Sequence, residues 1–134
     1  ISIGAMDGGS FELTDLGYRL ANLSVQPQLG KALLISNLLG IRPVGVGLAA
    51  SMSYKTPFVL PRQASRIAAD NSRVRLSNNS ESDGYLGIRV LKILDQMKKG
   101  KQGGGGSLHA WARDNFLSMA TLTMVSEIRR NVDR

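Results

Sequence analysis

Apolar residues recur at helical spacing in one stretch of this sequence after another, and this pattern constrains the fold more than any other feature. Residues three or four positions apart lie on the same face of an α-helix. The longest stripe of this kind consists of Leu86, Val90, Ile93, Leu94 and Met97. Similar stripes follow Thr14 and occupy the last quarter of the chain. The spacing therefore predicts a mainly α-helical fold.

Capping residues, prolines and glycines divide these stripes into about seven helices. Thr14 is a favourable N-cap, and either Ser82 or Asp83 caps a later helix. Pro27 and Pro43 suit the first turn of a helix. We expect helices at 14–23, 27–39, 43–54, 63–70, 83–99, 108–116 and 119–132. The sequence thus predicts a helical bundle. We expect its core to contain Leu16, Leu29, Leu33, Leu86, Val90, Trp111 and Phe116.

Two of these helices have unusual compositions. The 27–39 helix is apolar nearly all round, which predicts a central, buried position. The 43–54 helix carries Gly45, Gly47, Ala49 and Ala50. A glycine costs about 1 kcal/mol relative to alanine inside a helix. We expect this cost to be offset by close approach to a neighbouring helix.

The remaining segments predict a hairpin and two loops. A turn at Asp7–Ser10 separates two short apolar pieces, which predicts a small β-hairpin before the first helix. Polar residues at 71–82 and the glycine-rich stretch at 100–107 predict flexible loops.

The charge is basic and unevenly distributed. The chain holds 17 lysines and arginines against 10 aspartates and glutamates, a net charge of +7. Nine of the basic residues and four of the acidic ones lie between positions 61 and 101. Such an excess favours a polyanionic partner that is contacted through its phosphates. A solvated helix face together with a basic loop would give the same composition.

Several classes of chemistry are excluded. The chain has no cysteine and one histidine, His109, so it lacks the residues for a disulfide or a multi-histidine metal site. Lys55-Thr56 follows no glycine loop and therefore does not form a nucleotide-binding P-loop. We expect no catalytic site, no metal and no membrane span in this chain. Without a secretory signal pattern, we expect an intracellular, reducing compartment, whether nucleus, cytoplasm or mitochondrion.

A set of short motifs, in order along nearly the whole chain, resembles the helicase-associated region of DEAH/RHA-type RNA helicases. The motifs are Ile3-Gly4-Ala5-Met6-Asp7, Leu13-Thr14-Asp15-Leu16-Gly17, Gln28-Leu29-Gly30-Lys31, Leu48-Ala49-Ala50, Pro57-Phe58, Ser82-Asp83 and Arg113-Asp114-Asn115-Phe116. The stretch from Ser118 to Met124 is most similar to the RNA helicase A/maleless branch. The chain departs from the family pattern at Ser24, Gln26 and Gly84, where proline, aspartate and histidine are usual.

The resemblance implies the end of a winged-helix domain at 1–24 and a helical ratchet bundle at 25–134. In this family the ratchet forms one wall of the tunnel for single-stranded RNA and supports translocation. ATP and Mg are expected in motor domains outside this chain, and an OB-like domain is expected to follow the ratchet. The resemblance therefore implies an accessory RNA-binding domain, with no enzymatic activity of its own, in an ATP-dependent RNA helicase.

Candidate RNA contacts are Lys55, Arg62, Arg113 and Asn115. Lys55 and Arg62 lie in the loop after the small-residue helix, and the other two belong to the Arg-Asp-Asn-Phe motif. Alternatively, Arg113 pairs with an acidic residue and Asn115 caps a helix or loop. A second surface for RNA or a protein partner consists of Arg89, Lys92 and Lys99. It could equally be a solvated helix face.

Two other functions remain open at this point. The bundle could be an adaptor that binds protein partners, with incidental basic charge. It could also be an autonomous winged-helix DNA binder, although that would require a recognition helix before Ile1. The position of the basic residues discriminates between RNA binding and the adaptor, because a concave groove suits RNA and a convex patch suits an adaptor.

Overall fold

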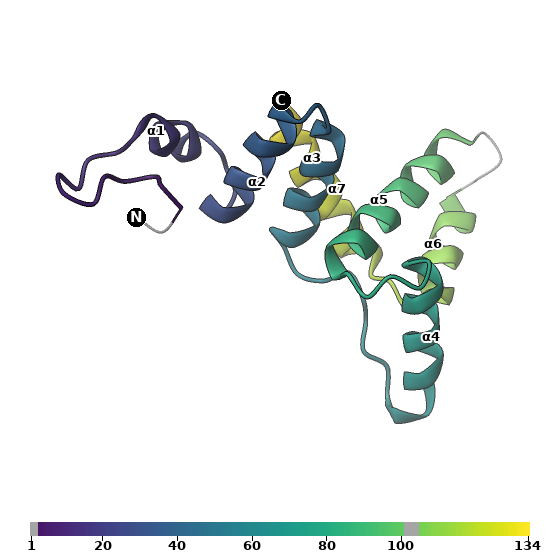
Figure 1. Cartoon of the computed structure of the whole chain (residues 1–134). Helices are drawn as coiled ribbons and strands as arrows, with labels where there is room; N and C mark the ends of the chain where they lie inside the picture. The colour runs from purple at the N-terminus through teal and green to yellow at the C-terminus, as the bar shows by residue number, and fades with distance from the viewer. Residues whose placement is uncertain (1–2, 101–104) are drawn as a thin grey trace.

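A computed structural model describes residues 3–100 and 105–134 and confirms the mainly α-helical fold (Figure 1). Helices α1 and α2 precede the small-residue helix α3, and a 3-10 turn, η1, leads into α4. A long helix, α5, and two further helices complete the bundle. The elements are α1 (Asp15–Ala21), α2 (Pro27–Leu38), α3 (Arg42–Met52), η1 (Gln63–Ser65), α4 (Arg66–Leu76), α5 (Asp83–Lys99), α6 (Gly105–Asp114) and α7 (Met119–Asp133).

Among the helix starts that the structure describes, those of α1, α5 and α7 have a side-chain cap. The hydroxyl oxygens of Thr14, Ser82 and Ser118 each accept a hydrogen bond from the backbone N–H three residues ahead, at 3.1, 3.3 and 3.3 Å. These bonds satisfy amides that would otherwise have no partner at a helix start. Helix α2 instead begins at Pro27 after Gln26, whose side chain makes no capping bond.

The expected hairpin is reduced to one antiparallel bridge, between Met6 and Leu13, in the described part of the N-terminal segment. Its turn is held by Asp7, whose Oδ1 accepts hydrogen bonds from the backbone N–H groups of Ser10 and Gly9 and from the Ser10 hydroxyl. These bonds, most of all the one from the Ser10 backbone N–H, lower the pKa of the Asp7 carboxyl group below its ordinary value.

Helix α3 occupies the centre and packs against α2, α5 and α7 (Figure 1). Its small residues permit this packing, as predicted. A Cβ atom on Gly45 would overlap the Ser36 hydroxyl of α2 and lie 2.5 Å from the Ser36 Cβ. A Cβ on Gly47 would lie 3.3 Å from Ile88 of α5. The two glycines therefore allow α3 to approach two neighbours closely at once.

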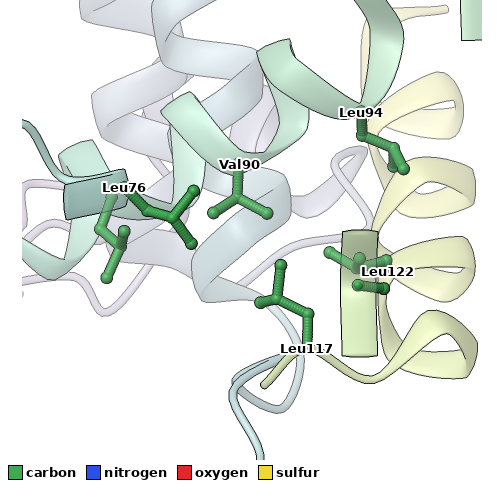
Figure 2. Close-up of a cluster of buried hydrophobic side chains, with 7 residues drawn as sticks. Leu76, Val90, Leu94, Leu117 and Leu122 are labelled. Atoms are coloured by element: carbon green, nitrogen blue, oxygen red, sulfur yellow. The ribbon is translucent and has the colours of Figure 1, made fainter. Parts of the chain in front are cut away.

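The main core lies between α4, α5, α6 and α7 (Figure 2). It contains the expected Leu86 and Val90, joined by Leu76, Leu94, Ala112, Leu117 and Leu122. Leu33 is also buried, whereas Leu16, Leu29, Trp111 and Phe116 are only half-buried. Trp111 packs against the outside of the cluster. The core is therefore aliphatic at its centre.

The prediction of a fully buried α2 is wrong. Gly30, Leu33 and Ser36 are buried on one face of this helix, against α1 and α3. Leu38 and Leu39, near Gly40 at the C-terminal end, are 85% and 68% exposed. Hydropathy alone does not reveal that α2 lies at the edge of the bundle, where one of its faces has no neighbour among the described residues.

The predicted boundary of α4 is also wrong. We expected a helix at 63–70 and a loop from 71, but α4 continues to Leu76. Ala69, Ser72 and Leu76 are buried at helical spacing, so tertiary packing supports a segment that its polar composition disfavours. The chain then turns at Asn78 and Asn79, which adopt positive φ angles of 54° and 61°. Asparagine tolerates this conformation better than most residues.

Half of the predicted loop at 100–107, namely residues 101–104, lies outside the described residues. Its last part, from Gly105, belongs to the first turn of α6, which begins three residues before the expected start at Leu108. The division into 1–24 and 25–134 stays a prediction.

Candidate nucleic-acid interface

A short backbone pairing joins the loop after α3 to the turn between α6 and α7. Phe58 and Leu117 form an antiparallel bridge. The N–H of Val59 donates to the Phe116 carbonyl at 2.8 Å, and the N–H of Ser118 donates to the Pro57 carbonyl at 2.8 Å. The pairing brings the loop that carries Lys55 and Arg62 beside the turn that follows Arg113.

An open groove of about 540 Å³ lies beside this pairing. Arg113 and His109 of α6 supply its polar groups, and both are exposed. Its apolar surface comes from Val59, Ala110, Ala112, Phe116, Leu117 and Met119. A groove that combines a guanidinium group with an apolar wall suits a backbone phosphate and the group attached to it.

Arg113 is available to a ligand despite its acidic neighbour. Its Nε lies 3.7 Å from Oδ1 of Asp114, and the two side chains are 81% and 69% exposed. Such an exposed pair contributes at most about 1 kcal/mol, so a phosphate can replace the carboxylate at little cost. Lys55 and Arg62 are also exposed, but neither lines the groove.

Asn115 is placed differently from the other three candidates, because it is buried with only 7% exposure. Its Oδ1 accepts hydrogen bonds from the Ser72 hydroxyl and from the Arg75 guanidinium, each at 3.0 Å. Its Nδ2 donates to the Trp111 carbonyl at 2.8 Å. The side chain thus connects α4 to the end of α6, which corresponds to the alternative capping interpretation. We do not include it among the proposed RNA contacts.

Asn115→Ala is expected to lower the free energy of unfolding by about 1–3 kcal/mol, because it leaves Ser72 and Arg75 without their acceptor. Asn115→Asp keeps the acceptor oxygen and should lose less. Urea denaturation of both variants measures the difference. RNA affinity, compared at a temperature where all variants are folded, should stay unchanged. Weaker binding by folded Asn115→Ala would instead identify Asn115 as an RNA contact.

Part of the basic excess in the middle of the chain serves the fold. The Arg73 guanidinium lies 4.8 Å from the centre of the Phe58 ring, and Arg75 bonds to Asn115. Arg89 Nε donates a hydrogen bond to the Leu76 carbonyl at 2.8 Å, which gives a partner to a backbone oxygen at the C-terminal end of α4. Arg89 therefore differs from Lys92 and Lys99, which are exposed on α5. No sequence motif distinguishes these structural arginines from ligand-binding ones.

Metal sites and membrane spans are two further features to consider. Within residues 3–100 and 105–134, no three histidine, cysteine, aspartate or glutamate side chains gather as they would around a metal ion. None of the helices in these ranges has the length and apolar character needed to cross a membrane.

The chain is similar to known helicase sequences. Residues 26–103 match the family described as "Helicase associated domain (HA2), ratchet-like". The DExH-box ATP-dependent RNA helicase DExH1 of Arabidopsis thaliana is 35% identical over 128 residues, which are 96% of this chain and 12% of that protein. The ATP-dependent DNA/RNA helicase DHX36 of Bos taurus is 34% identical over 118 residues, 88% of this chain and 11% of that protein. This chain thus spans only about an eighth or less of these relatives.

Proposed function

The chain belongs to the ratchet-like helicase-associated domain (HA2) family, and on this basis we propose that it is the RNA-binding accessory domain of an ATP-dependent DEAH/RHA-type RNA helicase. ATP and Mg would bind to motor domains elsewhere in the parent protein, and an OB-like domain would follow the bundle. The names of the relatives and the small share of their length that the chain covers support the assignment of RNA binding and ATP binding to different domains.

The bundle would form one wall of a tunnel for single-stranded RNA and hold the strand while the motor moves. The observation that carries this proposal is the position of Arg113 in an open groove, next to the paired loop that carries Lys55 and Arg62. Contacts to phosphates carry no sequence information, which suits a strand that must slide past the protein. To hold the strand, this wall needs affinity for RNA but no catalytic activity.

A salt titration of single-stranded RNA binding tests the proposal. Arg113→Ala and Arg62→Ala should each weaken binding by about 1 kcal/mol, roughly fivefold, because each removes one exposed phosphate contact. The slope of log K against log salt should become shallower by about 0.7 per lost contact.

Arg19→Ala is the matched control, because Arg19 is an exposed arginine on α1, at the other end of the molecule from α6 (Figure 1). It should change neither affinity nor slope. If the Arg113 and Arg62 variants behave like this control, the contact assignment is wrong.

A protein adaptor is the second candidate function. Arg73, Arg75 and Arg89 make contacts within the chain, so part of the basic charge is incidental to any ligand. Leu38 and Leu39 are exposed at one end of the bundle, as a protein-binding surface would require. Folded protein that fails to bind single-stranded RNA at low salt would favour the adaptor over the RNA-binding domain.

A further inference from the structure

A second cavity, of about 300 Å³, lies where α3, α5 and α7 meet the loop after α3. Its floor is apolar and includes the buried side chains of Val90, Leu91, Leu122 and Val125. Its residues differ from those that line the Arg113 groove. The cavity is at the small end of the roughly 300–1,000 Å³ typical of ligand pockets, so it suits one ring system rather than a larger ligand.

Aromatic and charged side chains surround this apolar floor. The loop after α3 lines the cavity with Tyr54 and with the consecutive residues Thr56, Pro57 and Phe58. Arg73 and Asp83 supply one positive and one negative group. Tyr54 is 41% exposed, so its ring is accessible to a ligand that enters from solvent. The combination of apolar floor, aromatic rings and few polar groups favours a flat, aromatic ligand with hydrogen-bonding edges.

We propose that this cavity binds one nucleobase of single-stranded RNA, an inference that rests on the RNA-binding function proposed above. Stacking on aromatic rings is the usual way in which proteins hold bases of a single strand. The Asp83 carboxylate can accept a hydrogen bond from an exocyclic amino group, as acidic side chains do from cytosine N4. The site therefore prefers cytosine to uracil, which has no amino group.

The loop after α3 connects this cavity to the phosphate contacts. Phe58 lines the cavity, while the next residue, Val59, lines the Arg113 groove. Lys55 lies between two cavity-lining residues in the sequence and is exposed. A strand held by Lys55 and Arg113 would thus pass a site for its base. The Arg73 guanidinium over the Phe58 ring adds positive charge beside the cavity.

Two ribose-phosphate oligomers of equal length and charge separate base binding from phosphate binding. One is oligocytidine and the other is abasic. The chain should bind oligocytidine about 5- to 150-fold more tightly, the range expected for one stacked base. Tyr54→Ala should remove most of this difference and leave the affinity for the abasic oligomer unchanged. Tyr18→Ala, which changes an exposed tyrosine of α1, is the matched control.

Asp83→Asn provides a second variant that keeps the size of the side chain. The chain should bind oligocytidine more tightly than oligouridine, and this variant should reduce the preference. Equal binding of the oligocytidine and abasic oligomers would overturn the base site while leaving the RNA-binding function intact. If the chain bound neither oligomer, the base site and the RNA-binding function would both be overturned. A Tyr54→Ala variant that weakens both oligomers equally would also contradict the base site.

Discussion

Leu94→Ala should lower the free energy of unfolding by about 2–5 kcal/mol, the largest stability loss expected for this chain. Leu94 is 1% exposed and belongs to the cluster that joins α5 to α6 and α7 (Figure 2). The substitution removes apolar contacts and leaves a cavity, since the surrounding helices relax only partly. Urea denaturation should show a lower midpoint with an unchanged m-value.

Leu38→Ala is the control for this prediction, because it makes the same chemical change at a side chain that is 85% exposed. Its effect should stay within about 0.5 kcal/mol. Equal losses in the two variants would mean that Leu94 does not occupy the centre of the core.

Gly45→Ala should destabilise the chain although alanine is the better helix former. The gain in helix propensity is about 1 kcal/mol. The new Cβ, however, would overlap the Ser36 hydroxyl, which is buried and donates to the Leu33 carbonyl at 2.7 Å. Overpacking of this kind costs about 1–3 kcal/mol, and the severe overlap places the cost of Gly45→Ala at the upper end of this range. We therefore expect a net loss of about 1–2 kcal/mol in thermal or urea denaturation.

The double variant Gly45→Ala with Ser36→Gly tests the cause of this loss. The Ser36→Gly change removes the side chain that the new Cβ at position 45 would overlap. The double variant should therefore lose less stability than the sum of the losses of the two single variants. A coupling free energy near zero would show that the contact between α2 and α3 is not what excludes a side chain at position 45.

The sequence was sufficient for the helical class and for most helix starts. Thr14 and Ser82 form the predicted caps because capping depends on residues within one turn. The predicted stripe of α5 also supplies Leu86, Val90 and Leu94 to the core. These features are local, so periodicity and residue type reveal them directly.

Features that depend on residues far apart in the chain could not be predicted from the sequence. Helix α4 is extended by burial of Ser72 and Leu76 against elements that follow it in the chain, and its polar composition gives no sign of this. Asn115 belongs to a motif that also contains the exposed Arg113, yet only the tertiary structure shows that it bonds to α4. For the same reason, charge counting could not separate the structural Arg73, Arg75 and Arg89 from exposed lysines such as Lys92.

The packing of α3 against α7 has a consequence for the order in which the bundle can assemble on the ribosome. Helix α3 ends at Met52, and α7 occupies Met119–Asp133. Translation at about 5–20 residues per second therefore separates the two helices by roughly 3–16 s. During that interval the part of the α3 surface that packs against α7 has no partner. The bundle consequently closes only after α7 has been synthesised, and its first half depends on that helix to complete its interior.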